Sequence, residues 1–322
     1  TVNKQKKLNE ANVLIIDRSS DASSGVGTNT SNDGLSFHNA FGTRVQDEKI
    51  CLNVPDAVQL LGVFQSNDND EPDLPSITLT GFDGPSGTNA DLIVGEKLTG
   101  LDEGAVVSIV EKSGTDSVGV INLNEVDLDI GEVVKGSKSG VTATVTAVTR
   151  GDRDITDYYQ LNTGLKPTFY DYSFIQRSKD LPEPDRKLKI IFKNFFVEES
   201  DTGDFYNASS YPTGSRPLIT SDPDYNLLLT DLIDLRPRVA NYDPSSSSAS
   251  PFTHSSRSFT TNGDGSLNPL VSDESLIVNY NYYLGRHDTL FLDRNGDFLY
   301  VQGVPSEQLL PPRANGDALE VA

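Results

Sequence analysis

The sequence predicts a mainly β protein in which several small β-barrel or β-sandwich modules are joined by long extended linkers, with few short helices. The apolar residues are Val, Ile, Leu, Tyr and Phe, with no Met and no Trp, and turn-forming residues are plentiful at 26 Gly and 17 Pro. This composition favours strands and turns over helices. A glycine-punctuated stretch occurs twice, and long segments rich in Ser, Asp and Pro separate the apolar runs.

Residues 1–88 are expected to form a β-rich N-terminal segment with loops. Ala11–Asp17 is a short apolar run that suits a strand or a short helix, and it is followed by a small, polar loop composition. Two further runs predict strands, Glu48–Val54 and Ser76–Phe82. The best helix candidates in the chain are Pro55–Phe64 and Pro223–Leu235.

Residues 89–150 are expected to form one small β-module built from two similar halves. Three glycines recur 36 residues further on, together with a glutamate, so that Glu96 matches Glu132. The matched glycines are Gly95 with Gly131, Gly100 with Gly136, and Gly104 with Gly140. Each copy predicts a strand, a Gly turn and a returning strand, because Gly permits the positive φ that tight hairpins need. Two copies are too few for a solenoid, so a single barrel or sandwich is expected from about Ala90 to Val148.

Residues 151–200 predict a β-hairpin or sandwich module. The alternation after Gly151 is interrupted at Asn162-Thr163-Gly164, as a hairpin requires. Arg186–Glu199 contains the strongest strand signal in the chain. Its alternation places Leu188, Ile190, Phe192 and Asn194 on one face and Lys189, Ile191, Lys193 and Phe195 on the other.

Residues 201–273 are expected to be an extended arm or linker, because their composition cannot bury a core. An apolar island, Leu227–Leu235, is expected to dock on the β-modules or on a neighbouring subunit. The Ser-rich stretch Pro244–Pro251 reads as a linker or an arm, and Tyr242–Phe259 is expected to become ordered mainly through other chains. Residues 274–322 recover strand character, with Asn295-Gly296 predicting a hairpin turn.

The net charge of −21, from 47 acidic and 26 basic residues, makes nucleic acid and membrane surfaces poor partners. It indicates a soluble surface, or alternatively salty or divalent-rich surroundings that screen the charge. No run reaches the roughly 18 apolar residues of a membrane span, and the basic start lacks the apolar core of a signal peptide. Because Met is absent throughout, we expect the chain to be a piece of a longer polypeptide. The single Cys51 excludes an internal disulfide and is expected to be a buried structural thiol.

No catalytic, cofactor or metal residues are assigned, and the chain is not expected to be an enzyme. The three histidines, His38, His254 and His287, have spacings that suit no zinc motif. No nucleophile elbow, phosphate loop, dinucleotide fingerprint or metalloprotease motif occurs. Two loops offer alternating oxygen ligands for calcium, but neither completes a twelve-residue calcium loop, so solvated loops are favoured. Their residues are Asp68, Asp70 and Asp73 in one loop, and Asn262 and Asp264 in the other.

Two groups of residues leave alternatives open. Several tyrosines could form a sugar-stacking platform or a protein interface, although half-buried cross-strand pairs are favoured. They are Tyr158, Tyr159, Tyr170, Tyr172, Tyr280, Tyr282 and Tyr283. Arg236-Pro237-Arg238, after Asp231 and Asp234, suggests charge pairing that serves either a chain–chain contact or an internal clamp.

Four segments together resemble successive parts of large virion structural proteins from contractile-tailed phages of cyanobacteria and marine bacteria. They are residues 151–177, 197–211, 230–259 and 282–308, and their order and spacing match. The glycine repeat is also similar to small β-modules of phage tail proteins, and the resemblance covers most of Leu60 to Glu307.

The resemblance implies a structural protein of a phage tail, baseplate or fibre-attachment region, which acts through other virion proteins as an oligomer in the particle. It transfers no catalytic residues. Alternatives are a receptor- or glycan-binding adhesin module of a tail fibre, with a host-surface receptor as partner, and a polysaccharide-degrading tailspike domain.

Overall fold

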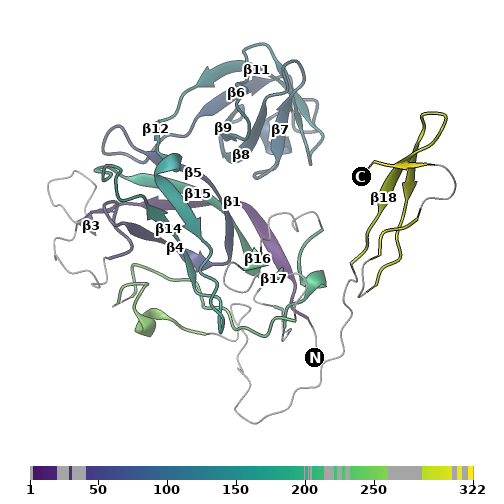
Figure 1. Cartoon of the computed structure of the whole chain (residues 1–322). Coiled ribbons are helices and arrows are strands. Elements are labelled where there is room, and N and C mark those ends of the chain that lie inside the picture. The colour runs from purple at the N-terminus through teal and green to yellow at the C-terminus, as the bar shows by residue number, and fades with distance from the viewer. Residues whose placement is uncertain are drawn as a thin grey trace, which may run out of the picture. The chain divides into compact units, whose positions relative to one another are not determined.

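The computed structural model divides the chain into two units, Thr1–Glu274 and Ser275–Ala322 (Figure 1). Each unit is mainly β, and the helices of the described residues are single 3₁₀ turns, which confirms the predicted fold class. These turns are η1 (Asn89–Asp91), η2 (Thr156–Tyr158), η3 (Ala208–Ser210) and η6 (His254–Ser256). The structure describes residues 3–19, 29–30, 41–198, 200–201, 203, 205–213, 221–222, 227–228, 233–247, 249–259, 285–306, 310–313 and 318–321.

The first unit is built on a β-sandwich of two antiparallel sheets. One sheet has the order β1-β15-β5-β12, with β1 (Lys6–Ile16), β15 (Leu188–Val197), β5 (Ala57–Gln65) and β12 (Arg153–Asp154). The other has the order β13-β14-β4, with β13 (Tyr159–Asn162), β14 (Tyr172–Arg177) and β4 (Lys49–Pro55). Apolar side chains from both sheets form one buried cluster that includes Ile50, Val63, Ile175 and Ile190. Burying this shared cluster holds the two sheets together.

Strand β15 lies at the centre of its sheet, between β1 and β5, and is buried on both faces. Leu188, Ile190 and Phe192 belong to the sandwich core, as the alternation predicts, whereas Ile191 and Phe195 join separate clusters on the opposite face. This double burial explains why β15 carries the strongest strand signal.

The proposed helix at Pro55–Phe64 is wrong, because this segment is strand β5. β5 pairs with both β15 and β12, and these ladder bonds override any local helix preference. Asp56 alone separates β4 from β5, and its φ of 64° turns the chain from one sheet to the other. Asp is one of the few residue types that adopts this left-handed conformation readily.

A closed six-stranded barrel is inserted between the neighbouring strands β5 and β12 (Figure 1). Its order is β10-β11-β6-β9-β8-β7, with β6 (Ser76–Thr80), β7 (Lys97–Gly100), β8 (Val106–Ser113), β9 (Ser117–Asn122), β10 (Val133–Gly136) and β11 (Thr142–Thr149). The segment that enters the barrel and the segment that leaves it lie side by side. Asp152 accepts hydrogen bonds from the Asn67 side-chain amide (2.6 Å) and the Asp73 backbone (2.9 Å). Fourteen buried apolar side chains fill the barrel.

The two copies of the repeat adopt the same local structure, related by an internal pseudo-twofold axis. Around the closed barrel, β7, β8 and β9 are matched by β10, β11 and β6. The register shift between Ile109 and Glu111 in the first copy recurs between Val145 and Ala147 in the second. The third strand of the second copy is therefore β6, which precedes the repeat in sequence, so the barrel begins at Ser76 and not at residue 89.

A buried glutamate from each copy joins the two halves of the barrel. Glu96 accepts backbone hydrogen bonds from Ile93 in its own copy (2.6 Å) and from Lys138 and Ser139 in the other (3.0 and 2.9 Å). Glu132 makes the matching set with the backbone N–H groups of Asp129, Asp102 and Glu103, at 3.2, 3.4 and 3.4 Å. The matched glycines Gly100 and Gly136 are explained by this contact, because a Cβ at Gly100 would lie 2.0 Å from Glu132 Oε1 and a Cβ at Gly136 would lie 2.8 Å from Glu96 Oε2.

The structure groups residues 1–88 and 151–200 differently from the expected separate segments. β1 pairs with β15 along its length, and β4 pairs with β14. Both segments therefore contribute strands to each of the two sandwich sheets. The β1–β15 pairing joins residues nearly two hundred positions apart and the β4–β14 pairing joins residues more than one hundred apart, which local patterns do not reveal.

The described residues of 201–273 are mostly without regular secondary structure, and part of this region contacts the sandwich of its own chain. The Ser-rich stretch packs on its own sandwich: Ser250 donates to the Phe41 carbonyl (2.8 Å), the Tyr242 backbone donates to Asn53 (2.8 Å), and Arg18 donates to Pro244 (3.0 Å). Of the apolar island, β17 (Leu227–Leu228) pairs with β16 (Ser221–Asp222). The remainder of the helix candidate Pro223–Leu235 that precedes residue 233 lies outside the described residues.

The second unit contains a small sheet of order β19-β18-β20, with β18 (Thr289–Leu292), β19 (Phe298–Val301) and β20 (Leu319–Glu320). The predicted Asn295-Gly296 hairpin is confirmed by the antiparallel pairing of β18 with β19. Asp293 accepts hydrogen bonds from the Asn295 and Asp297 backbones at 2.8 and 2.9 Å, and Gly296 has a φ of 90°. Among the described residues, β2 (Arg18–Ser19) also pairs with β3 (Asn29–Thr30).

Candidate functional site

The three-stranded sheet of the second unit exposes an apolar face, which is the leading candidate for a binding surface. Cross-strand partners point to the same side of a sheet. Leu290 lies opposite Tyr300, and Leu292 lies opposite both Phe298 and Leu319. Val321 donates its backbone hydrogen bond to Leu290, which places it beside that residue. The C-terminal apolar face therefore consists of Leu290, Leu292, Phe298, Tyr300, Leu319 and Val321.

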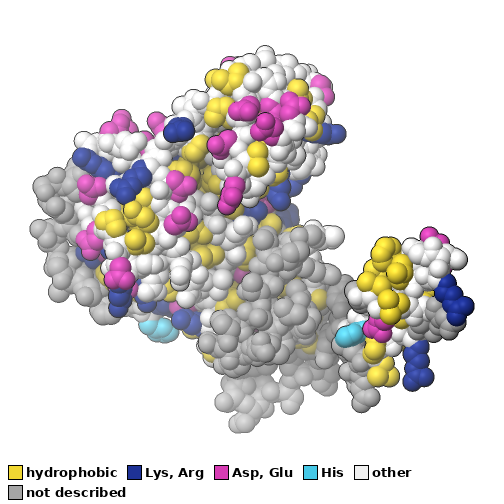
Figure 2. Space-filling model, turned by 45° about the horizontal axis from the view of Figure 1, so that its top comes forward, with side chains coloured by type: hydrophobic (Ala, Val, Ile, Leu, Met, Phe, Trp, Pro, Cys, Tyr) yellow, Lys and Arg dark blue, Asp and Glu magenta, His cyan; other side chains and the backbone are white. Residues whose placement is uncertain are grey.

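Most side chains of this face are exposed although they are apolar. Phe298 and Leu319 are each 67% exposed, and Tyr300 and Val321 are 59% and 50% exposed. Figure 2 shows hydrophobic side chains gathered along one side of this unit. Contiguous exposed apolar side chains of this kind mark interaction surfaces in soluble proteins. On the opposite side of the sheet, Phe291 is buried and its cross-strand partner Leu299 is 45% exposed.

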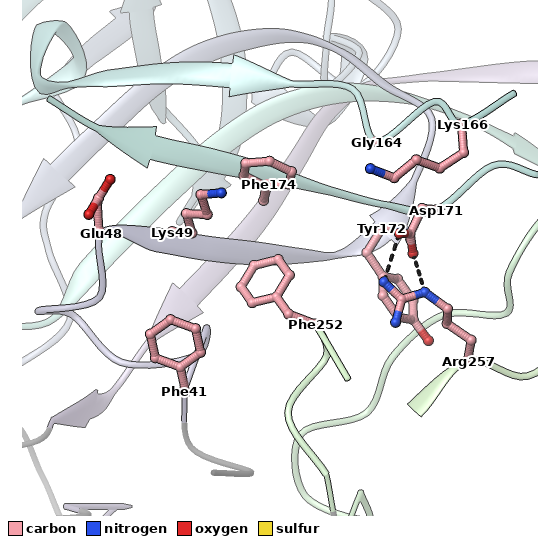
Figure 3. Close-up of a pocket in the computed structure, with 10 residues that line it drawn as sticks. All are labelled: Phe41, Glu48, Lys49, Gly164, Lys166, Asp171, Tyr172, Phe174, Phe252 and Arg257. Atoms are coloured by element: carbon pink, nitrogen blue, oxygen red, sulfur yellow. Dashed lines mark hydrogen bonds and ion pairs between the residues drawn. The ribbon is translucent and has the colours of Figure 1, made fainter. Parts of the chain in front are cut away.

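A second candidate is a pocket of about 390 Å³ in the first unit, which we call the phenylalanine pocket (Figure 3). Three half-buried rings line it in an edge-to-face array: Phe174 and Phe252 are 5.6 Å apart between centroids, and Phe41 and Phe252 are 6.0 Å apart. Phe174 comes from β14, and the other two come from loops that cross the sheet. Gly42 makes this crossing possible, since a Cβ there would lie 2.6 Å from the Phe252 ring.

Charged side chains surround the rings of the phenylalanine pocket. Arg257 forms two hydrogen bonds of 2.7 Å with the two carboxylate oxygens of Asp171, so this pair is neutral and fixed. Glu48 accepts a hydrogen bond from Gln176 at 3.1 Å. Lys49 places its ammonium 5.3 Å from the centroid of Phe174, and Lys166 extends from the opposite side (Figure 3).

The tyrosines that could have formed a sugar-stacking platform are core residues where the structure describes them. Tyr159, Tyr170 and Tyr172 are buried, and Tyr158 is half-buried. Tyr170 and Tyr172 make edge-to-face contacts with Tyr206 and Tyr242, respectively. Tyr280, Tyr282 and Tyr283 lie outside the described residues.

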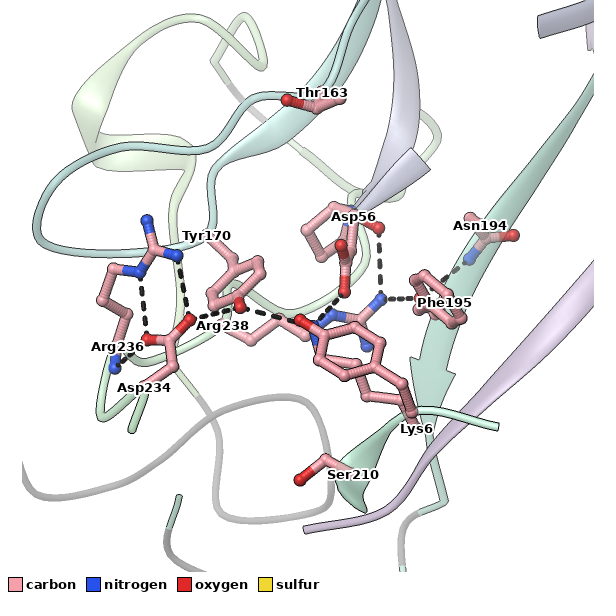
Figure 4. Close-up of polar contacts among 12 residues, drawn as sticks. Lys6, Asp56, Thr163, Tyr170, Asn194, Phe195, Ser210, Asp234, Arg236 and Arg238 are labelled. Carbon is pink, nitrogen blue, oxygen red and sulfur yellow. Dashed lines mark hydrogen bonds and ion pairs between the residues drawn. The ribbon is translucent and has the colours of Figure 1, made fainter. Parts of the chain in front are cut away.

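Arg236 and Arg238 form an internal clamp (Figure 4). Asp234 accepts two hydrogen bonds from the Arg236 guanidinium, at 3.0 and 2.8 Å, and a further one from the Tyr170 hydroxyl at 2.5 Å. Burial opposes ionisation of Asp234, but Arg236 outweighs it and lowers the pKa of that carboxyl. Arg238 is buried and donates to the Pro55 carbonyl at 3.1 Å, so the segment is tied to the β4–β5 corner.

Lys6 is a buried ammonium at the same place in the fold (Figure 4). It pairs with Asp56 at 2.8 Å and donates to the hydroxyls of Tyr170 and Tyr211 at 3.3 and 3.1 Å. The rings of Tyr170, Tyr206 and Tyr211 lie 4.4–4.6 Å from its nitrogen. Burial lowers the pKa of Lys6, but Asp56 and the tyrosines raise it above its ordinary value, so the cation is retained. Because its own chain fills this aromatic cage, the cluster fixes β1 to the sandwich.

The remaining candidates from the sequence are Cys51, the two possible calcium loops and the histidines. Cys51 is buried as predicted, and burial raises the pKa of its thiol to about 12. Within the described ranges, no three metal-binding side chains cluster. Asp68 caps its own loop by accepting from the Ser66 hydroxyl and the Asp70 backbone. His38, Asn262 and Asp264 lie outside the described residues.

Sequence reasoning missed both leading candidates. The pocket joins Phe41, Phe174 and Phe252, which are far apart in sequence and show no common spacing. The C-terminal apolar face could have been predicted from "LFLDRNGDFLYV", which has apolar residues on both sides of its strands. A sheet that packs on one core needs apolar residues on one side only.

None of the helices in the described part of the chain is long and apolar enough to cross a membrane. Comparison with known proteins gives no relatives: no family model, no curated protein and no solved structure matches this chain.

Proposed function

We propose that this chain is a structural protein of a phage tail, baseplate or fibre-attachment region, and that it works by binding other virion proteins. The observation that carries the proposal is the C-terminal apolar face. On one side of this sheet of three short strands, Phe298, Tyr300, Leu319 and Val321 are exposed and Leu290 and Leu292 are half-buried, so covering that side would stabilise the sheet. Covering the exposed area of these side chains contributes roughly 1 kcal/mol each to association.

The architecture of the first unit supports a mechanical role. The nested barrel, the sandwich and the Ser-rich stretch each have buried contacts. The Lys6–Asp56 pair ties β1 to the β4–β5 corner, and Arg238 ties the segment before the Ser-rich stretch to the same corner. The resemblance of four sequence segments to tail and baseplate proteins points to the same class of function.

The test measures incorporation of the chain into particles. Phe298→Asp places a charge on the C-terminal apolar face, and Val304→Asp adds the same charge at an apolar residue that is 78% exposed and lies outside that face, as a matched control. Quantitative mass spectrometry of purified particles should find the wild-type chain and the control at equal levels, and Phe298→Asp reduced by about tenfold or more.

Absence of the wild-type chain from particles would contradict the proposed function. Normal incorporation of Phe298→Asp would instead show that the chain assembles through another surface.

A further inference from the structure

The phenylalanine pocket has the size and shape of a receptor for a ring. Its volume of about 390 Å³ falls in the range of small-ligand sites, which is roughly 300–1,000 Å³. Phe174, Phe252 and Phe41 line the hollow and are only half-buried, and Phe252 packs edge-to-face against the other two rings. A further aromatic ring extends such an array in the same geometry.

The charges around the pocket favour an anionic partner. Arg257 and Asp171 neutralise each other. The Gln176 amide that donates to Glu48 is uncharged, so Glu48, Lys49 and Lys166 together leave the lining with a net charge of +1. Among the residues that the structure describes, neither Lys49 nor Lys166 lies within ion-pairing distance of a carboxylate. The cations face the same hollow from two sides (Figure 3), in a chain where acidic residues outnumber basic ones by 47 to 26.

We propose that the phenylalanine pocket binds an aromatic side chain flanked by carboxylates on a partner protein. The ring enters the phenylalanine array, and the flanking carboxylates pair with Lys49 and Lys166 at the rim. This inference rests on the proposed function, because it names the chemistry of one partner contact of an assembly protein. It assigns that contact to the first unit, whereas the C-terminal apolar face belongs to the second.

The test uses the purified chain and three short probes: N-acetyl-Asp-Phe-Asp-amide, the ring-free Asp-Ala-Asp peptide, and the charge-reversed Lys-Phe-Lys peptide. Ligand-observed NMR titration should give a dissociation constant of about 1 mM for the Asp-Phe-Asp probe. The other two probes should bind at least about fivefold more weakly, because each lacks one of the two recognised features.

Protein variants locate the site. Lys49→Glu with Lys166→Glu should weaken binding of the Asp-Phe-Asp probe about tenfold or more, since two ion pairs are lost and two repulsions added. Lys97→Glu, an exposed lysine on barrel strand β7, reverses a charge elsewhere and should leave the dissociation constant unchanged.

Three results would overturn the inference: equal binding of all three probes, no binding below about 10 mM, or unchanged binding by the double-lysine variant. Binding of an acidic oligosaccharide such as an oligoglucuronate, with loss in the same variant and no peptide binding, would reassign the pocket to a glycan. Because this assay needs no particle, its failure is distinguishable from failure of the incorporation test.

Discussion

Substitution of Glu96 by Ala tests the reasoning that the two halves of the barrel are held together by exchanged carboxylate contacts. Glu96 is fully buried and accepts four hydrogen bonds, including one from the Ser139 hydroxyl at 3.0 Å. Each hydrogen bond to a charged group contributes about 1.5 kcal/mol at the low end. The donors lie on exposed loops and regain water in the variant, so we expect roughly half of that sum, about 3 kcal/mol. Glu132→Ala should cost about half as much, because its bonds are fewer and longer.

Hydrogen exchange measured by mass spectrometry resolves this loss within the chain. Peptides that cover β8 and β11 should exchange about 100-fold faster in Glu96→Ala, while peptides from β15 in the sandwich serve as the internal reference. Unchanged barrel exchange, equal effects of the two alanine variants, or equal loosening of β15 would refute the reasoning.

The stability that Glu96 contributes should also depend on pH. Burial opposes ionisation of Glu96, but the backbone N–H groups of Ser139, Ile93 and Lys138 outweigh it and lower the pKa. A carboxyl with a lowered folded-state pKa contributes stability that is present above its unfolded pKa, about 4.3, and lost as the pH falls through the folded value. Glu96→Gln cannot gain this contribution, so the difference in exchange between wild type and Glu96→Gln should narrow below about pH 4.3.

Three further outcomes follow from buried or strained positions. Asp56→Asn should destabilise the first unit by about 3 kcal/mol in urea unfolding, because it leaves the buried ammonium of Lys6 without its counter-charge; a change below about 0.5 kcal/mol would contradict the buried pair. Gly104→Ala should cost about 1 kcal/mol from its φ of 76° alone, since nothing lies within 4 Å of the new Cβ, and a stabilised variant would show that the turn can relax. The Cys51 thiol, whose pKa burial raises to about 12, should resist a thiol-specific reagent in the native chain at pH 8 and react in urea, and rapid native labelling would contradict its burial.

Local features of the fold were predictable where the physics is local. The repeated glycines predicted matched hairpins, and Asn295-Gly296 predicted a turn, because both rest on the φ values of single residues. The strand at β15 was predictable because burial on both faces leaves a continuous apolar signal.

Long-range features were not predictable by the same means. The strand identity of β5 depends on β15 and β12, and the burial of Tyr242 depends on a partner about seventy residues away, Tyr172. The phenylalanine pocket likewise depends on two loops that cross one sheet. Each of these features depends on a contact between residues far apart in the sequence. Neither the loop-closure cost nor the geometry of such a contact produces a local sequence pattern.

The two copies of the barrel repeat differ in polarity at matched positions because their surroundings differ. The bulged residue Val110 of the first copy and the neighbouring Ile121 are buried against the sandwich, in a cluster with Ile191. Their pseudo-twofold counterparts, Thr146 and Thr80, are exposed. The backbone bulge is the same in both copies, so the fold itself does not require an apolar residue there. The difference in polarity must come from what each copy contacts, and the copy with the apolar outer face is the one that docks on the sandwich.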